Sequence, residues 1–116
     1  MGWIGVDLDG TLALHSGNTE DIGGPIPPMV NRVKKWLDEG KDVRIFTARV
    51  GRGPSAEERV QAVKDIKVWC KRFIGKELPV TACKDYTMLE LWDDRAVQVL
   101  HNTGEPVLLP ASRRTF

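Results

Sequence analysis

The residues best suited to chemistry in this chain are acidic, and they occur as two pairs. Asp7 and Asp9 follow a short apolar run near the start, and Asp93 and Asp94 follow another near residue 90. Four carboxylates brought together repel one another, and each is driven toward protonation unless a cation neutralises the group. Oxygen ligands with no His or Cys beside them favour a hard ion, most commonly Mg²⁺ where a phosphate shares it. If the fold joins the two pairs, we expect a Mg²⁺ site, for which Ca²⁺ is the less suitable alternative.

Polar and cationic residues follow two further apolar runs. Thr47 and Arg49 come after the run 43–46, and Lys84 comes after the run 79–82. A phosphate ester resists attack because its own negative charge repels nucleophiles. A metal ion, the Lys84 ammonium, the Thr47 hydroxyl and loop amides would screen that charge in the transition state. These groups therefore predict phosphoryl chemistry.

The first acidic pair offers the two reactive groups that such chemistry needs. A carboxylate such as Asp7 could attack phosphorus and form an aspartyl-phosphate, which divides one hard displacement into two easier ones. Asp9 lies two residues on, so in an extended segment it shares the side of the chain that carries Asp7. Asp9 could protonate the leaving oxygen and then deprotonate the hydrolytic water. We therefore predict Asp7 as nucleophile and Asp9 as general acid/base.

These residues need a scaffold that brings distant segments together, and the sequence pattern predicts one. Pro27 and Pro28 open a helix, and Ser55 with Glu58 matches a capping box for a second helix that runs to about residue 73. A third, brief helix is expected at 96–101. Short apolar runs predict strands at 3–6, 43–46, 79–82 and 88–92.

Strands that alternate with helices predict an α/β fold, a doubly wound three-layer sandwich with a central parallel sheet and helices on both faces. In open α/β sheets the ligand site lies beyond the carboxyl ends of the strands, where the acidic, hydroxyl and basic residues above are expected to meet. We expect one domain over 1–116, with a flap loop or small hairpin at 13–26 and a tail at 106–116. Within the tail, 107–109 would add an edge strand or pack as coil.

Composition limits the classes of function. The chain has 116 residues, of which 41% are hydrophobic and 28% charged, as is typical of one soluble globular domain. Its net charge of +1 does not mark it as a nucleic-acid or membrane binder. The start does not read as a signal peptide, and no apolar run approaches the roughly 18 residues of a membrane span, so we expect a cytoplasmic protein. Cys70 and Cys83 lack metal-ligand spacing and are predicted to be reduced, mostly buried thiols.

The motifs around these residues resemble those of the haloacid dehalogenase (HAD) superfamily of aspartate-nucleophile hydrolases. Residues 7–11, Asp-Leu-Asp-Gly-Thr, look like its first motif, and 46–49, Phe-Thr-Ala-Arg, look like its second. Lys84 stands at the third, and 91–96, Leu-Trp-Asp-Asp-Arg-Ala, look like the fourth. The match extends over nearly the whole chain. It implies a HAD-like Rossmannoid fold and Mg²⁺-dependent hydrolysis of a phosphomonoester.

The resemblance also implies a role for each motif residue. Asp7 would be nucleophile and metal ligand, and Asp9 the acid/base that also offers its backbone carbonyl to Mg²⁺. Asp at position 9 separates the phosphatases of the superfamily from branches that catalyse dehalogenation or ATP-driven transport. Asp94 would bind the metal directly, through water, or support Lys84. The residues expected to hold the substrate are Gly10, Thr11, Thr47, Ala48, Arg49 and Lys84, and those expected to hold the metal are Asp7, Asp9, Asp93 and Asp94.

The segments between the motifs leave no room for a cap domain. By resemblance, capless members leave the site open and act on large substrates such as proteins or nucleic-acid ends, or close it by oligomerising. Residues 46–49, 57–59 and 93–95 are also loosely similar to the phosphatase domain of phage polynucleotide kinases, although the chain has no kinase P-loop. The phosphorylated substrate, whether nucleotide, nucleic-acid end, sugar phosphate or phosphoprotein, and the oligomeric state stay open.

Simpler interpretations stand beside these. The segment 7–11 could be an ordinary strand-to-turn junction, Thr47 could cap a helix, and Lys84 could be a solvated surface charge. Asp93 and Asp94 could cap a following helix. Two other functions also stay open, a phospho-ligand-binding module without catalysis and a phosphotransferase or mutase on the same fold.

Four further residues have two readings each. Arg49, Arg52 and Arg59 could form a basic rim that grips a polyanion, or a solvated charged face. His15 could touch the leaving group of the substrate, although a plain loop histidine is the simpler interpretation. The tryptophans are expected to pack in the core.

Overall fold

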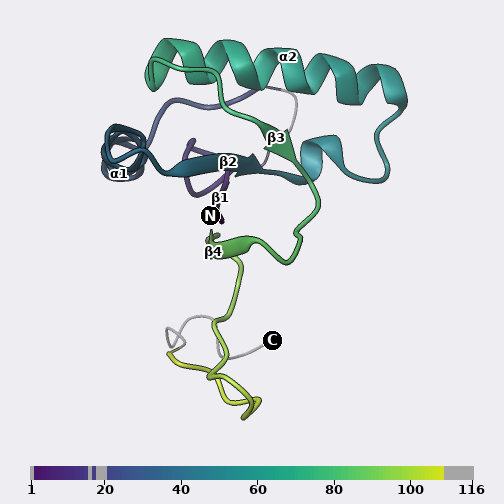
Figure 1. Cartoon of the computed structure of the whole chain (residues 1–116). Coiled ribbons are helices and arrows are strands. Elements are labelled where there is room, and N and C mark those ends of the chain that lie inside the picture. Colours follow the sequence, from purple (N-terminus) through teal and green to yellow (C-terminus); the bar gives the residue numbers. More distant parts are fainter. Residues whose placement is uncertain (1, 16, 18–20, 109–116) are drawn as a thin grey trace.

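The computed structural model describes residues 2–15, 17 and 21–108, and its centre is a parallel sheet (Figure 1). The strands are β1 at Trp3–Asp7, β2 at Asp42–Phe46, β3 at Val80–Thr81 and β4 at Met88–Trp92. They stand in the order β3-β2-β1-β4, and each neighbouring pair is parallel. The four predicted strands and the α/β class with a parallel sheet are therefore confirmed.

β1 lies between β2 and β4, which explains its apolar sequence. Residues 3–6 are all buried, as expected for a strand with neighbours on both sides and chain on both faces. The register pairs Asp7 with Phe46 of β2, and Val6 with Trp92 of β4. The carboxyl ends of these three strands consequently lie next to one another.

Two α-helices form where the sequence predicts them. α1 spans Pro27–Asp38 and begins with proline, whose missing amide hydrogen costs nothing at a helix start. α2 spans Ala56–Phe73, and its capping box is present, because the side chains of Ser55 and Glu58 each accept a hydrogen bond from the other's amide at 3.1 Å. A 3-10 helix, η1, spans Ala48–Val50 directly after β2. Within the described ranges, no helix has both the length and the apolar character to cross a membrane.

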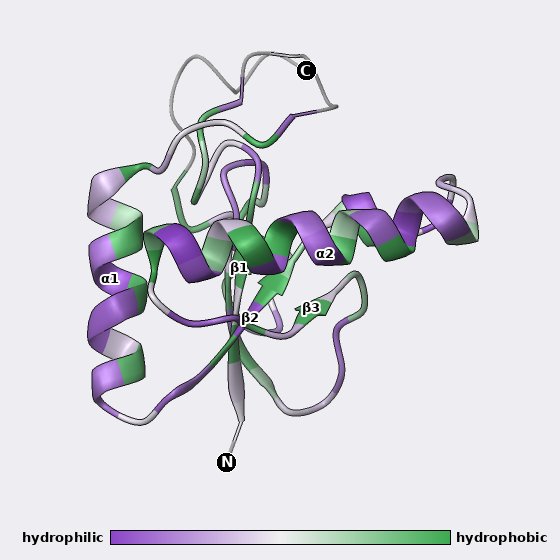
Figure 2. Ribbon diagram, turned by 90° about the horizontal axis from the view of Figure 1, so that it is seen from above, coloured by the Kyte–Doolittle hydropathy of each residue, from purple (hydrophilic) through white to green (hydrophobic). Residues whose placement is uncertain are grey.

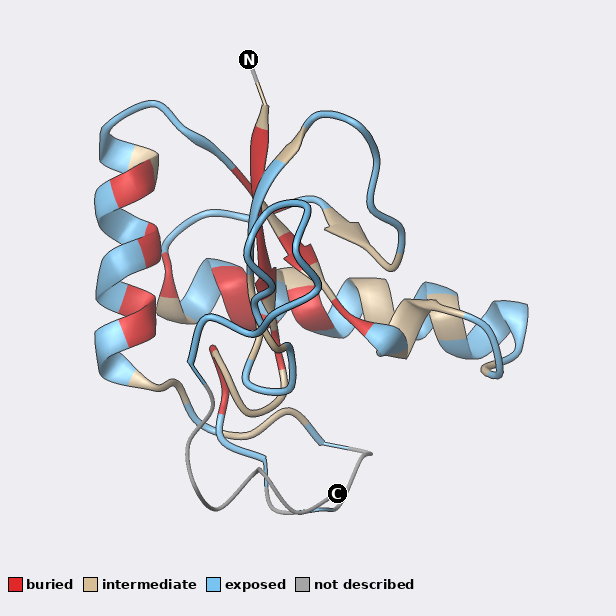
Figure 3. Ribbon diagram, turned by 90° about the horizontal axis from the view of Figure 1, so that it is seen from below, coloured by how far each residue is buried: buried red, intermediate tan, exposed pale blue. Residues whose placement is uncertain are grey.

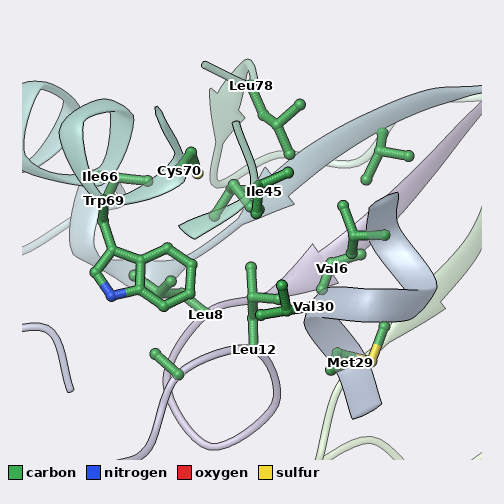
Figure 4. Packing of buried hydrophobic residues seen from close by; sticks show 14 of the residues in the cluster. Val6, Leu8, Leu12, Met29, Val30, Ile45, Ile66, Trp69, Cys70 and Leu78 are labelled. Carbon is green, nitrogen blue, oxygen red and sulfur yellow. The ribbon is translucent and has the colours of Figure 1, made fainter. Parts of the chain in front are cut away.

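One hydrophobic core joins both helices to the same face of the sheet. Figure 2 shows α2 lying across the strands with α1 beside it, and Figure 3 shows the buried parts of both helices turned toward the strands. Alternate strand residues point to opposite faces, so the core residues of β1 and β2 mark one face. Figure 4 shows how closely these side chains pack. The core includes Ile4, Val6, Leu8 and Leu12 from β1 and its loop, Met29, Val30, Val33 and Trp36 from α1, Val43 and Ile45 from β2, and Ile66, Trp69 and Cys70 from α2.

The opposite face of the sheet is crossed by the connection from β3 to β4. Trp3 points to this face, and its indole nitrogen donates a hydrogen bond to Asp85 Oδ1 at 3.0 Å. Right-handed crossovers place α1 and α2 on one face and carry this connection over the other. Residues 82–87 are too few for a crossover that contains a helix. The second helical layer that the sequence predicts is therefore not found, and the described helices form one layer.

Residues 96–101, predicted as a brief helix, do not form one: Val99 makes an antiparallel β-bridge with Pro106, and a turn follows at 101–103. After β4 the chain leads away from the sheet (Figure 1), and the Leu100 amide donates to the Glu105 carbonyl while the Val107 amide donates to the Gln98 carbonyl, both at 2.8 Å. A helix this short needs a core against one face, and this segment is largely exposed. In the predicted tail, 107 and 108 are exposed coil, and 109–116 lie outside the described residues.

Some apolar positions are more exposed than predicted. The helical spacing of apolar residues along α2 predicts that Val60 and Val68 face or flank the core, but they are 56% and 69% exposed. Val68 stands two residues after Ile66, which is about 200° around the helix and on its solvent side. Val60 lies toward the end of α2 that Figure 3 shows as largely exposed, beyond the short β3. Cys83 is also exposed, whereas Cys70 is buried as predicted.

The loop predicted at 13–26 is closed at its base as a small hairpin. The Leu14 amide donates to the Gly24 carbonyl at 2.8 Å, and the Ile26 amide donates to the Leu12 carbonyl at 2.9 Å. The Trp69 indole fastens the loop to α2 by donating to the Gly23 carbonyl at 2.9 Å. Residues 16 and 18–20 lie outside the described residues.

Candidate functional site

Three carboxylates meet at the carboxyl end of the sheet and are termed here the carboxylate cluster. Asp7 is the last residue of β1, and Asp93 and Asp94 follow β4, its neighbour. One oxygen from each side chain lies within 4.8 Å of the other two. The prediction that acidic residues from the first and last strands converge is therefore confirmed. Hard divalent cations bind between carboxylate oxygens of this kind.

Thr11 contacts two members of the carboxylate cluster. Its hydroxyl lies 3.3 Å from Asp7 Oδ2 and 3.3 Å from Asp94 Oδ1, and it accepts a hydrogen bond from the Asp94 amide at 3.0 Å. The third member is held by its own turn, because Asp93 Oδ1 accepts from the Arg95 amide at 2.8 Å. Thr11, which the resemblance assigned to the substrate, thus contacts two predicted metal ligands.

Gly10 permits the close approach of Thr11 and Asp94. Its φ of +89° lies in the left-handed region, which glycine adopts without strain. A Cβ at this position would lie 2.6 Å from Asp94 Oδ2. Only glycine therefore lets the turn after β1 pass so close to the second acidic pair.

Burial, together with the neighbouring like charges, makes Asp7 a weak acid in the absence of a counter-charge. Burial raises the pKa of Asp7 from 3.8 to about 7, and the charge of Asp93 and a hydrogen bond with Asp94 add to the rise, while the Thr11 hydroxyl opposes it. A cation among these oxygens would cancel the repulsion and favour the ionised form of Asp7. The electrostatics of the cluster thus favour cation binding.

Asp9 pairs with Arg49 and is not a member of the carboxylate cluster. The guanidinium donates from Nε to Asp9 Oδ2 at 2.7 Å and from Nη2 to Asp9 Oδ1 at 2.8 Å, a bidentate pair. Nη2 also lies 3.3 Å from the Asp21 carbonyl, and His15 Nδ1 lies 3.8 Å from Asp9 Oδ1. The side chain of Asp9 therefore does not join the other predicted metal ligands, and Arg49 links it to the loop at 13–26.

Thr47 is buried, with 2% exposure, and its hydroxyl accepts a hydrogen bond from the Arg49 amide at 3.2 Å. It therefore caps η1, as the simpler interpretation predicts. Thr47 also lines a cavity of about 480 Å³, a size common among small-molecule sites. The cavity is lined by Asp7, Asp9, His15, Phe46, Thr47, Ala48, Arg49, Asp93, Asp94 and Arg95.

Lys84 does not line this cavity. It is exposed in the connection from β3 to β4 and forms no ion pair with another residue of the described chain. β2 separates β3 from β1, and adjacent strands lie about 4.8 Å apart, so the third motif begins two strands away from Asp7. Its role in phosphate binding stays a prediction.

The three arginines that the sequence suggested as one basic rim do not lie in one cavity. Arg49 faces Asp9, whereas Arg52 and Arg59 line a second cavity beyond η1. Phe46 and Arg95 also line the first cavity, although neither is among the predicted site residues. Each stands next to a motif residue at the end of a strand, and this position in the sequence could have indicated that it lines the site.

Comparisons with known proteins support the fold. No protein-family model matches the chain, and no curated protein matches it. Among solved structures, the chain is similar to a conserved protein from Bacteroides thetaiotaomicron, with 24% identity and a TM-score of 0.55. The similarity covers 83% of this chain and 78% of that protein. It shows a shared fold and carries no information on activity.

Proposed function

We propose that this protein is a Mg²⁺-dependent phosphomonoester hydrolase, a capless phosphatase of the HAD type that acts through an aspartyl-phosphate. The observation that carries the proposal is the carboxylate cluster, whose three oxygens lie within 4.8 Å of one another. The same cavity contains Asp9, Thr47 and Arg49, which are suited to proton transfer and phosphate binding. The motif resemblance supports the same function.

The residues of the cluster fit Mg²⁺. Asp7, Asp93 and Asp94 offer carboxylate oxygens, and His15 contacts Asp9 rather than the cluster. The pKa of Asp7 is raised first by burial and then by the charges of Asp93 and Asp94, and a divalent ion would neutralise these like charges. These three side chains would hold the ion, and the ion would neutralise the substrate phosphate beside Asp7.

Two other side chains are suited to bind the phosphate. The Thr47 hydroxyl oxygen accepts from the Arg49 amide, so its own hydrogen can donate to a phosphate oxygen. The Arg49 guanidinium carries donors in a planar fork that matches two phosphate oxygens. With the phosphate held, a carboxylate oxygen of Asp7 attacks phosphorus, and the bond from phosphorus to the leaving oxygen breaks.

Asp9 would handle the protons of both steps. Both of its carboxylate oxygens accept hydrogen bonds from Arg49, so one must be exchanged before Asp9 can donate to a leaving group. An incoming phosphate competes for the same guanidinium, and substrate binding would thereby release Asp9. Once released, the Asp9 carboxylate takes up a proton from solvent and passes it to the leaving oxygen. It later accepts a proton from the water that attacks the aspartyl-phosphate, and this second step frees inorganic phosphate and restores Asp7. Asp9 returns that proton to solvent when its pair with Arg49 re-forms.

The test is phosphate release from p-nitrophenyl phosphate with and without Mg²⁺. We expect Mg²⁺-dependent release, and a loss of about 10³-fold or more in kcat for Asp7→Asn, because the nucleophile is removed. Asp42→Asn, at the opposite end of the sheet, is the matched control and should retain activity. No hydrolysis of this or other phosphomonoesters would favour a binding module. Less free phosphate when an alcohol acceptor is added would instead indicate a phosphotransferase.

A further inference from the structure

A second cavity, termed the arginine groove, lies on the other side of η1 from the candidate site. Its volume is about 630 Å³, and it lies between the carboxyl end of β3 and the first turns of α2. Ala48 and Arg49 line the first cavity, and the next two residues line the second, so η1 is the wall between them. The arginine groove is lined by Val50, Gly51, Arg52, Arg59, Val60, Val63, Val80, Thr81, Ala82 and Cys83.

The arginine groove combines an apolar floor with two cations. Its floor consists of valine and alanine side chains, and the described residues that line it include two arginines and no acidic residue. Arg59 is half-buried and donates to the Pro54 carbonyl, which holds it in place, whereas Arg52 is exposed. Guanidinium groups remain charged and pair preferentially with phosphate or carboxylate. The groove therefore suits a ligand with an apolar ring and an anionic group.

The two cavities adjoin one another. The first is lined by Ala48 and Arg49. The next two residues, Val50 and Gly51, line the second, so the cavities are neighbours across this single turn. A substrate whose reacting phosphate lies at Asp7 would reach the arginine groove with a leaving group that extends past η1. The volume of the groove is that of a small-molecule site rather than of an extended polymer track.

We propose that the arginine groove binds the leaving group of the substrate and that this substrate is a nucleoside bisphosphate. One phosphate reacts at Asp7, the base lies on the apolar floor, and Arg52 with Arg59 binds the second phosphate. The proposal rests on the proposed function for the reacting phosphate. The preference of the groove for a second phosphate can be measured without catalysis.

The kinetic test compares adenosine 3′,5′-bisphosphate with 3′-AMP and 5′-AMP, each of which lacks one phosphate. We expect kcat/KM to be at least about tenfold higher for the bisphosphate, the effect of one charge-assisted hydrogen bond. In Arg52→Gln and Arg59→Gln this ratio should fall toward one through KM. Arg59→Gln also removes the hydrogen bond from Arg59 to the Pro54 carbonyl and could impair folding. Arg52→Gln leaves that bond in place, so it provides the test in that case. Arg72→Gln, at the other end of α2 against Phe73, should leave the ratio unchanged.

Cys83 supplies a readout that is independent of catalysis. It is exposed and lines the arginine groove, whereas burial raises the pKa of the Cys70 thiol to about 11 and protects it from alkylation. Adenosine 3′,5′-bisphosphate should slow the reaction of Cys83 with iodoacetamide more than either AMP does at equal concentration. Arg52→Gln should abolish this difference.

The outcomes separate the two proposals. Mg²⁺-dependent hydrolysis of p-nitrophenyl phosphate with no preference for the bisphosphate and no protection of Cys83 overturns the groove and leaves the proposed function standing. Arg52-dependent protection without hydrolysis of any substrate supports the groove and overturns the proposed function. A 3′-phosphorylated oligonucleotide that binds more tightly than the bisphosphate through Arg52 overturns the assignment of a small substrate.

Discussion

Two acidic residues at the end of β1 stand two positions apart and have opposite surroundings. Asp7 faces Asp93 and Asp94, and burial with these like charges raises its pKa to about 7. Asp9 faces Arg49, which donates hydrogen bonds to both of its carboxylate oxygens. The carboxylate cluster concentrates charge of one sign, whereas the Asp9–Arg49 pair contains its own counter-charge.

The difference shows which counter-charge the chain itself supplies and which would come from a bound ion: Asp9 has a cation in Arg49, whereas a divalent ion would neutralise the carboxylate cluster. The cluster gains stability when a cation arrives, because its like charges are then neutralised. Under the proposed function, the Asp9–Arg49 pair would open in exchange for the substrate phosphate. A phosphomonoester bound with Mg²⁺ would supply both partners, so each half of the site would respond to a different part of the same substrate complex.

Among changes that leave the three aspartates of the carboxylate cluster in place, removing the counter-charge of Asp9 should have the largest effect. Arg49→Gln takes away the bidentate partner of Asp9 and a donor to the phosphate, so kcat/KM for p-nitrophenyl phosphate should fall about hundredfold. The matched control is Arg44→Gln, because Arg44 also binds a carboxylate, that of Asp42, away from the site. Steady-state kinetics should give a change below about twofold for this control. Near-wild-type activity of Arg49→Gln would break the comparison.

A methyl group at position 10 should disturb the carboxylate cluster and leave the Asp9–Arg49 pair in place. Gly10→Ala places a side chain at φ +89° and 2.6 Å from Asp94 Oδ2, so we expect a loss of about 1–2 kcal/mol in the free energy of unfolding. Displacement of Asp94 should also weaken Mg²⁺ binding about tenfold.

Gly75→Ala is the control for backbone strain. Gly75 has φ +97° and no atom within 4 Å of the added Cβ, so this variant should lose similar stability in denaturant titrations without weaker Mg²⁺ binding. Equal Mg²⁺ affinity of Gly10→Ala and the wild type would show that Asp94 does not bind the ion.

A smaller effect is expected in the pH dependence of the free energy of unfolding, to which the carboxylate cluster contributes through Asp7. Asp7 titrates near 3.8 when unfolded and near 7 when folded, so the folded protein holds the extra proton between these values. The free energy of unfolding of the metal-free protein should therefore fall as pH rises from about 4 to about 7, by about 1–2 kcal/mol after solvent screening. Asp7→Asn should remove this fall, and Mg²⁺ should reverse it.

Asp85 provides a control of opposite sign in the same experiment. Hydrogen bonds from Thr87 and Trp3 lower the pKa of Asp85 to about 2, so its contribution is present above about pH 4 and is lost as pH falls through 2. Chemical denaturation of Asp85→Asn should retain the fall between pH 4 and 7. Identical pH slopes for the wild type and Asp7→Asn in that window would contradict the raised pKa of Asp7.

Much of the scaffold could be predicted because its signals are local. The apolar run at 88–92 coincides with β4, and the capping box of Ser55 and Glu58 forms as its pattern indicates. The meeting of Asp7 with Asp93 followed from a general rule on the carboxyl ends of parallel strands.

The remaining features depend on tertiary arrangement. Asp9 and Arg49 are 40 residues apart, and their contact depends on the register of β1 with β2, which no local signal encodes. Lys84 is exposed because β3 is the outer strand of the sheet. The helix expected at 96–101 does not form because no core lies against that segment.

The most direct test of the central claim is a calorimetric titration of the protein with Mg²⁺, in parallel with Asp93→Asn, which leaves the Asp9–Arg49 pair intact. We predict one saturable site per chain in the wild type, with proton release near pH 6.5 as Asp7 ionises, and at least about tenfold weaker binding in Asp93→Asn. Absence of saturable binding in the wild type, or equal affinity of the two proteins, would contradict the account.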